Sequence, residues 1–499
     1  MTTLDTLTLL AYAAMLVGIA LYHSRKIHAR DDYFLAGRSM SRWPIALSMY
    51  VALFSTNTFV GVIGWVNRPE GTLWIGLQNI GMILAVPLVV RLYPGLYYRL
   101  RISTAYEYLE MRFDYRVRAM AGLLFIGARV MWMATMLYAG GLVISQMLGW
   151  TPGNGVPQGQ LYAILLLGGL GMFFGLAGGM HAVIWTDVAQ FFVLFGSVAA
   201  MVGLAFALSG GPAHVLSVAV AAGKLAPPRL FSLTDDLSIV SGLCLGFIGM
   251  LASAGTDQVI LQTYLTAKSE REAKGSLWYS GFFLKPLSLI FPVLGAIIFV
   301  YFHEHPQAAA PMRVPDDALA VFVLNVLPGG VRGLAIAALM SALLTSLAGG
   351  MAALTACVQV DFIQRGMKRV LSGRDAVRLG RALMFAWGVV IVSAAVMVMR
   401  LGKNNNIIQI LNIVMYPFTG VLLGVFLLAL LTRRANSRGA LIGAAASFAA
   451  TIALPISGRP VSNFFYGAIG ALTTLALGYA ASSGTPPQAR TEGAVSPGR

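Results

Sequence analysis

Thr345 and Ser346 stand side by side in an apolar stretch that carries no charged residue from Gly333 to Val360. Ala342 lies one helical turn earlier, and the spacing i, i+3, i+4 places all three residues on one helical face. Two hydroxyl groups and a backbone carbonyl are oxygen ligands of the kind that a hard monovalent cation needs. The alternative is that each hydroxyl donates to the carbonyl four residues earlier in its own helix.

Arg129, Asp187 and Lys285 are among the ionisable residues that fall within predicted membrane spans, where a charge is a candidate for function. Arg129 has two roles open to it: a bidentate contact with a solute carboxylate, or a structural ion pair with Asp187. Asp187 itself is a candidate to steer an ion toward its exit. Lys285 lies about ten residues, or about 15 Å, into its span, so it needs an acceptor there. Asp257, in "GTDQ", is expected to cap a helix.

The elements that must position these residues are membrane helices. Of the 499 residues, 58% are hydrophobic and only 11% are charged. Apolar windows of about twenty residues predict about thirteen spans. They lie near residues 5–23, 43–66, 72–97, 117–148, 159–177, 180–208, 237–266, 275–302, 331–362, 377–400, 405–431, 438–457 and 463–482.

Two of these spans carry small and polar residues where a continuous helix would have leucine. They are "FSTNTFVGVIGW" (54–65) and "GMLASAGTDQVILQ" (249–262). Unwound backbone is tolerated at membrane depth only where it lines a cavity or binds something. Paired broken helices in matching positions are typical of an inverted-repeat transporter with its site at the breaks.

The net charge of +16 arises from 35 basic and 19 acidic residues. The basic residues concentrate in alternate loops, as at Arg99 and Arg101 or Arg433 and Arg434, which indicates membrane topology and not a nucleic-acid partner. The N-terminus is then outside and the C-terminus cytoplasmic, in the inner (plasma) membrane. We find no nucleotide loop, nucleophile elbow or catalytic triad, so the sequence does not favour an enzyme.

The chain resembles the sodium:solute symporter family, which includes sodium/glucose, proline and sialic acid cotransporters. The resemblance runs from about residue 5 to about residue 480. It is carried by "DDYFLAGRSM" (31–40), "STNTFVGVIGW" (55–65), "STAYEYLEMRF" (103–113), "GGMHAVIWTDVAQ" (178–190), "GTDQVILQTYLTAKSEREAKG" (255–275), "GFFLKPLSLIFPVLG" (281–295) and "MSALLTSLAGGMAALTACVQVD" (340–361).

The resemblance implies an all-α, polytopic, LeuT-like fold, in which an inverted five-helix repeat is joined by one N-terminal and two C-terminal helices. The expected parts are the N-terminal helix (1–24), repeat one (40–208), repeat two (237–432), two C-terminal helices (433–482) and a disordered cytoplasmic tail (483–499).

The resemblance also implies a sodium site, with the ion co-transported. Its ligands would be the carbonyls of Val51, Phe54 and Ala342 and the hydroxyls of Thr345 and Ser346. Asp187 matches an acid that belongs to a second sodium site in some members. The next turn, Ala348-Gly349, lacks the hydroxyls of that site, so one sodium ion per cycle is expected.

The solute contacts are implied less directly. Sugar-transporting members place polar contacts at positions that match Thr58, Gln78, Lys285 and Gln409, and Asn57 is a further candidate for a solute contact. The same members have an acid where Gln78 stands and an aromatic pair where Ser253-Ala254 stands. Arg129 lies about one turn from the arginine that binds the carboxylate in sialic acid transporters.

The predicted function is sodium-coupled import of a small polar solute by alternating access. A sugar or polyol is the first expectation for the solute, and a monocarboxylate or other organic anion is the alternative. A membrane solute sensor is the alternative from another class. The expected partners are the solute, sodium and the lipid bilayer, and a monomer suffices.

Overall fold

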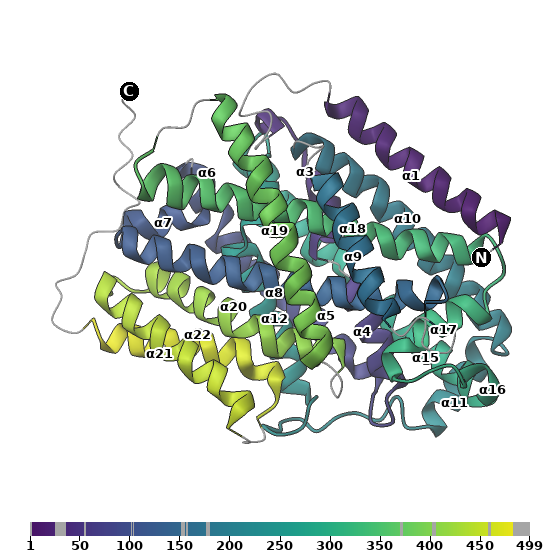
Figure 1. The fold of residues 1–499 in the computed structure, drawn as a ribbon. Coiled ribbons are helices and arrows are strands. Elements are labelled where there is room, and N and C mark those ends of the chain that lie inside the picture. Colours follow the sequence, from purple (N-terminus) through teal and green to yellow (C-terminus); the bar gives the residue numbers. More distant parts are fainter. Residues whose placement is uncertain are drawn as a thin grey trace.

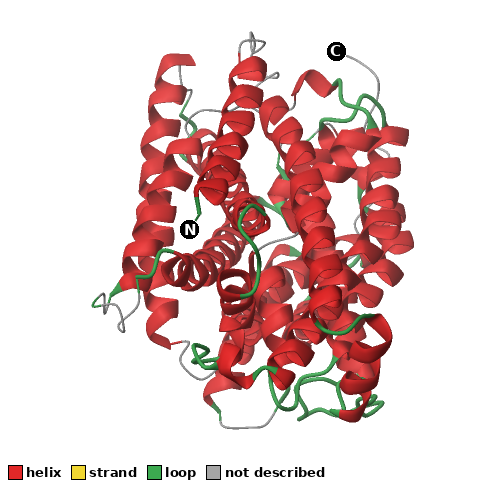
Figure 2. Ribbon diagram, turned by 90° about the vertical axis from the view of Figure 1, so that its right-hand side faces the viewer, coloured by secondary structure: helices red, strands yellow, loops and turns green. Residues whose placement is uncertain are grey.

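Long apolar windows become helices in a bilayer because each backbone N–H and C=O must be satisfied within its own segment. The structure, a computed structural model, describes residues 2–24, 36–53, 56–100, 102, 104–150, 155, 158–175, 180–369, 373–401, 406–457 and 461–482. Within these ranges the only β-type pairing is one isolated bridge between Met40 and Ala267. The described elements are helices joined by loops (Figure 2), which agrees with the all-α prediction.

The first half of the bundle follows the predicted spans closely. Its long helices are α3 (Arg42–Leu53), α4 (Thr56–Asn67), α5 (Leu77–Leu92), α8 (Tyr115–Met147), α9 (Gly159–Gly175) and α10 (Met180–Leu208). Two short helices, α6 (Pro94–Leu100) and α7 (Ala105–Arg112), connect α5 to α8. The helix α11 (Pro212–Ala221) follows α10.

The helices of the second half have more interruptions. Its principal helices are α12 (Ile239–Thr256), α13 (Gln258–Leu265), α14 (Glu270–Trp278), α15 (Ile290–Glu304), α18 (Val331–Cys357), α19 (Gly373–Leu401) and α20 (Ile407–Leu431). The short α16 (Pro306–Ala309) and α17 (Ala318–Asn325) lie between α15 and α18. A π-helical stretch, Tyr279–Leu284, and a 3-10 turn, Lys285–Leu289, join α14 to α15.

Three more helices flank this core. The N-terminal helix α1 (Thr3–Ser24) packs against α10 and α18. The C-terminal helices α21 (Ser437–Ile456) and α22 (Tyr466–Ala480) pack against each other and against α20. Figure 1 shows α1 along one edge of the bundle and α21 and α22 along the opposite edge.

Within the described residues each predicted span is mainly helical, and both predicted breaks are present. Helices α3 and α4 meet at an angle of 51°. Helix α12 stops at Thr256, and α13 starts after the extended residue Asp257. In the described residues nine helices are long and apolar enough to cross a membrane, or up to ten with the bent α3–α4 pair. Thirteen spans, and the division into two repeats at the expected boundaries, therefore stay predictions.

Candidate functional site

The two helix breaks border a cavity of about 140 Å³ inside the bundle. Its walls come from the end of α3 and from α4, α5, α8, α12 and α20. Most of the lining is apolar. The side chains with hydroxyl or charged groups in the lining are Thr58, Arg129, Ser253, Thr256, Asp257, Tyr416 and Thr419. The cavity thus combines one guanidinium, one carboxylate and several hydroxyls, a set suited to a small hydroxylated solute.

Arg129 is the buried cation of this cavity, with only 4% of its surface exposed. Its Nη1 donates to Asp257 Oδ2 at 3.3 Å, and its guanidinium carbon lies 4.2 Å from the centre of the Trp132 ring. Arg129 Nε has no hydrogen-bond partner among the described residues. The ion pair with Asp187 that the sequence left open is not formed, because Arg129 meets the acid at the α12–α13 break.

Asp187 lies instead against α3. It is 5% exposed, and its Oδ2 accepts a 2.6 Å hydrogen bond from the Ser48 hydroxyl. Ser48 precedes Val51 by three residues, which is about one helical turn. Asp187 is therefore one turn away along α3 from the first residue expected to bind sodium.

The residues expected to bind sodium come from α3 and α18, two helices that contact each other. Val51 and Ala342 are each 1% exposed and Ser346 is 6% exposed. Ser346 Oγ is buried and has no hydrogen-bond partner within the described residues. Phe54 and the Thr345 side chain lie outside what the structure describes.

Hydroxyls in two other helices, α13 and α20, donate to the carbonyl four residues earlier. Thr263 donates to the carbonyl of Val259 at 2.8 Å, and Thr419 donates to that of Met415 at 3.1 Å. A buried hydroxyl without a partner costs about 1–3 kcal/mol. In α18 the buried Thr355 hydroxyl, like that of Ser346, has no partner among the described residues. The missing back-bond therefore leaves the Ser346 hydroxyl available to an ion, but it does not distinguish Ser346 from Thr355.

Lys285 lies away from the cavity, at the start of the 3-10 turn before α15. It is 7% exposed, and its Nζ lies 5.8 Å from the centre of the Tyr50 ring. No described residue forms a salt bridge with it. The distortion of this span was not predicted, although Pro286 was its signal, because proline removes a helical N–H and clashes with the preceding turn.

The three amide residues expected to contact a sugar are not gathered in the cavity. Gln409 Nε2 donates to Asp236 Oδ2 at 2.7 Å, and its Oε1 accepts from Arg68 Nη1 at 3.0 Å. Asn57 Nδ2 donates to the Thr135 hydroxyl at 3.0 Å. Gln78 is half-buried and lies one turn before Met82, which does line the cavity. Of the five residues expected to contact a sugar, only Thr58 lines the cavity.

The contacts of Gln409 belong to a polar network that joins α4, α12 and α20 beyond the cavity. Arg68 follows α4 and Asp236 precedes α12. Burial raises the pKa of Asp236, whereas Arg68 and Gln409 oppose that shift. Nearby, Asp316 accepts from the Ile407 backbone N–H at 3.0 Å and from the Asn406 side chain.

Three tyrosines bind the carbonyls that the break after α12 leaves free. Tyr97, Tyr106 and Tyr264 donate to the carbonyls of Gly255, Thr256 and Ala254 at 2.7, 3.1 and 3.2 Å, respectively. This arrangement was not predicted. Tyr106 lies in "STAYEYLEMRF" and Tyr264 in "GTDQVILQTYLTAKSEREAKG", but nothing in the spacing of the three tyrosines indicates which carbonyls they reach.

The chain was compared with protein families and with known proteins. The model of the sodium:solute symporter family matches residues 33–446. The sodium/sialic acid symporter NanT of Aliivibrio fischeri is 28% identical over 482 residues, which cover 96% of this chain and 92% of that protein. SiaT of Proteus mirabilis, also a sodium/sialic acid symporter, is 26% identical, covering 94% of this chain and 93% of SiaT.

Solved structures give the same fold. The substrate-bound, outward-open structure of a Na⁺-coupled sialic acid symporter aligns with a TM-score of 0.85 at 24% identity, covering 97% of this chain and 99% of the other. The closed conformation of Mhp1, a nucleobase-cation-symport-1 family transporter, aligns with a TM-score of 0.55 at 14% identity, covering 90% and 93%. These alignments confirm the LeuT-like fold class. With the family match over most of its length, the chain belongs to the sodium:solute symporter family and is a multi-pass, sodium-coupled symporter, not an enzyme.

Proposed function

We propose that this symporter imports a small carboxylate that also carries hydroxyl groups, an acidic sugar of the sialic acid class. The observation that carries the proposal is the buried guanidinium of Arg129 in a cavity that also presents the hydroxyls of Thr58, Ser253 and Thr419. NanT and SiaT, which resemble the chain over nearly its full length, are sodium/sialic acid symporters.

Arg129 retains capacity for a further anion. A guanidinium has five N–H donors in a fixed fork that matches a carboxylate. The structure gives Arg129 one hydrogen bond to a carboxylate, at 3.3 Å. The Trp132 ring supports its flat face, so the guanidinium is held in position for recognition.

An acidic sugar combines the two alternatives for the solute, a sugar and an organic anion, and the residues that line the cavity favour a solute with an acidic group. Lys285 and Gln409, on which a neutral sugar contact depended, do not line the cavity. The hydroxyls that do line it suit a sugar framework. An acidic sugar uses the guanidinium and the hydroxyls together.

For the ion, we propose one sodium held by the carbonyls of Val51, Phe54 and Ala342 and by the hydroxyls of Thr345 and Ser346. The Ser346 hydroxyl, which has no partner among the described residues, lies on α18, a helix that contacts both α3 and α4, and this supports the site. Asp187, one turn away on the Ser48 side, would receive the ion on its way to the cytoplasm. Sodium binding would favour the outward-open state that completes the solute site, and the repeats would then rock around it.

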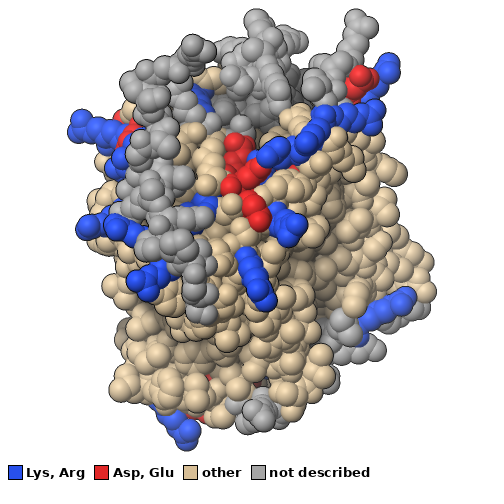
Figure 3. Space-filling view, turned by 90° about the vertical axis from the view of Figure 1, so that its left-hand side faces the viewer, with Lys and Arg blue, Asp and Glu red and all other residues tan. Residues whose placement is uncertain are grey.

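The proposed orientation has the N-terminus outside and the C-terminus in the cytoplasm of the inner (plasma) membrane. Figure 3 views the bundle from the left-hand side of Figure 1, and blue Lys and Arg side chains are more numerous than red ones on this face. Arg116 and Arg118 at the start of α8 and Arg433 and Arg434 after α20 belong to the loops expected inside. A basic excess of this kind is typical of cytoplasmic loops.

Uptake by proteoliposomes with an inward sodium gradient tests the function. We expect sodium-dependent uptake of sialic acid, and binding and uptake of its methyl ester that are weaker by at least about tenfold, because the ester lacks the charge that Arg129 binds. Arg129→Gln should weaken binding of the acid to about the level of the ester, and Arg129→Lys should also weaken it, because an ammonium cannot form the bidentate contact. Equal uptake of acid and ester, or unchanged binding in Arg129→Gln, would contradict the proposal.

A further inference from the structure

Asp257 uses its two carboxylate oxygens for two different partners. Oδ1 accepts from the Val259 backbone N–H at 2.8 Å, so Asp257 is the N-cap of α13, as the sequence predicted. Oδ2 accepts from Arg129 Nη1 at 3.3 Å. The cap needs only the first oxygen, so the second contact calls for a separate explanation.

We infer that Asp257 is a built-in competitor for the anionic group of the solute: it holds Arg129 while the cavity is empty, and the solute carboxylate replaces it on the guanidinium. This inference rests on the proposed function and deepens it, because it assigns to Asp257 the control of affinity and charge selectivity.

The geometry of the pair suits an exchange. Charge-assisted N–H···O bonds are commonly about 2.7–2.9 Å long, so a contact of 3.3 Å is a loose one. The side chain of Arg129 is 4% exposed whereas that of Asp257 is 25% exposed. The carboxylate is thus the partner that has room to withdraw, and its Oδ1 remains bound to α13 when Oδ2 leaves.

Arg129 is held in place by groups other than Asp257. Its guanidinium lies over the Trp132 ring. Its Nε lies against α18, where a methyl group added at Gly350 would be 3.0 Å from Nε. Since these neutral contacts persist without Asp257, the guanidinium can exchange one carboxylate for another without moving.

The net charge of the cavity lining explains how the exchange would couple solute binding to sodium. Arg129 and Asp257 are the charged residues among those that line it, and together they are neutral. An unpaired buried cation would be costly in the empty state. When a monoanionic solute enters together with one sodium ion, the net charge inside the protein stays the same. Entry of the anion alone would leave an uncompensated charge, which links solute binding to sodium.

Asp257→Asn tests the inference, because asparagine is also a good N-cap and keeps the fold while removing the charge. The probes are sialic acid and its methyl ester, titrated at saturating sodium into the purified full-length protein. We expect Asp257→Asn to bind sialic acid about tenfold more tightly than the unsubstituted chain, since Arg129 no longer has to be released. Affinity for the ester, which does not need Arg129, should stay the same.

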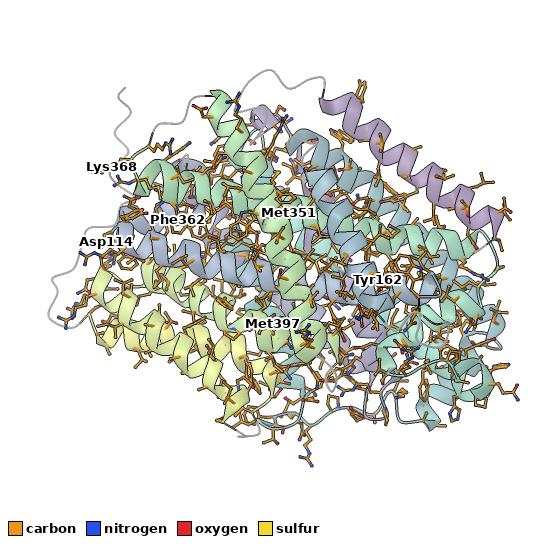
Figure 4. All side chains as sticks on the ribbon, in the orientation of Figure 1. Asp114, Tyr162, Met351, Phe362, Lys368 and Met397 are labelled. Atoms are coloured by element: carbon orange, nitrogen blue, oxygen red, sulfur yellow. The ribbon has the colours of Figure 1, made fainter. Side chains whose placement is uncertain are left out.

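Asp114→Asn is the matched control. Asp114 caps α8 by accepting from the Val117 N–H at 3.1 Å, and Figure 4 places it at one end of the bundle, apart from Met351 in its middle. This variant should leave both affinities unchanged. Asp257→Ser, which also preserves a capping hydroxyl, repeats the test if the asparagine variant folds poorly. A purely structural effect would move acid and ester affinities together.

The outcomes separate the two proposals. If the chain binds sialic acid through Arg129 but Asp257→Asn binds it no more tightly, the exchange is wrong and the proposed function stands. If Asp257→Asn loses affinity for the acid, Asp257 contacts the solute directly and the exchange is again wrong. If the unsubstituted chain does not bind the acid at all, the proposed function is wrong and the exchange fails with it.

Discussion

The Ser48 hydroxyl donates a 2.6 Å hydrogen bond to Asp187, and this bond joins α3 to α10 one turn before Val51. An acid at this depth, for which the described residues give one neutral donor, places a carboxyl group beside the proposed sodium path. The carboxylate has a second oxygen and further lone pairs available for an ion.

Asp187→Asn should slow transport without weakening sodium binding at equilibrium. The amide removes the charge that would attract the ion as it leaves, while the proposed ligands on α3 and α18 remain. We expect the initial uptake rate to fall by at least about tenfold, with the sodium concentration for half-maximal binding changed by less than about threefold. A variant that loses rate and sodium affinity equally would instead make Asp187 a sodium ligand.

Ser346→Ala should weaken sodium binding, because the buried Ser346 hydroxyl has no partner among the described residues and is proposed to bind the ion. A hydrogen bond or ligand contact to a charged group contributes about 1.5–3 kcal/mol, so sodium affinity should fall by at least about tenfold. The measurement is sodium-dependent thermal stabilisation of the purified protein. Ser393→Ala is the control, because the exposed Ser393 hydroxyl donates to the Val389 carbonyl at 2.9 Å. Sodium stabilisation that persists in Ser346→Ala would remove this residue from the site.

Gly350→Ala should disturb Arg129, whereas Gly349→Ala should not. A Cβ at Gly350 would lie 2.3 Å from Met133 Sδ and 3.0 Å from Arg129 Nε, whereas nothing lies within 4 Å of a Cβ at Gly349. Overpacking of this kind costs about 1–3 kcal/mol. The expected result is lower thermal stability and weaker sialic acid binding for Gly350→Ala only. Similar behaviour of the two variants would argue against close packing of α18 on Arg129.

Tyr97→Phe should destabilise the break between α12 and α13. It removes the hydroxyl that donates to the Gly255 carbonyl at 2.7 Å, and a buried carbonyl left without a donor costs about 1–3 kcal/mol. Tyr93→Phe is the matched control, because the buried Tyr93 hydroxyl has no partner within the described chain. Thermal unfolding in detergent should separate the two variants. Equal stability would mean that the Tyr97 hydroxyl contributes nothing to the break.

Stability should also depend on pH through Asp316, which lies outside the predicted spans. Burial raises the pKa of Asp316 from 3.8 to about 7, so between these values the folded protein holds a proton that the unfolded chain has lost. Stability is therefore greatest below this window and falls as pH rises through it, by at most about 1.4 kcal/mol per pH unit.

Asp316→Asn should flatten that slope when thermal unfolding is followed from pH 4 to pH 8. Asp235→Asn is a suitable control, because Asp235 forms a 3.4 Å surface pair with the 76%-exposed Arg229, and such pairs contribute little to stability. A slope that survives in Asp316→Asn would assign the titration to another group.

The helices, both breaks, the family and the cap formed by Asp257 could be predicted from the amino-acid sequence alone. These features are local. The length of a hydrophobic window indicates the length of a span, and a short polar residue before a helix indicates its N-cap. The shared face of Ala342, Thr345 and Ser346 follows from helical spacing in the same way.

Contacts between residues that are far apart in the chain could be identified only from the tertiary structure. Arg129 and Asp257 are 128 positions apart, and nothing in either segment selects Asp257 over Asp187 as the partner. The same holds for Gln409, which joins Arg68 and Asp236 and not the cavity. Within one helix, geometry fixes neighbours through the 3.6-residue period. Between helices, the residues that contact each other depend on how whole helix faces pack. That packing depends on contacts throughout the bundle.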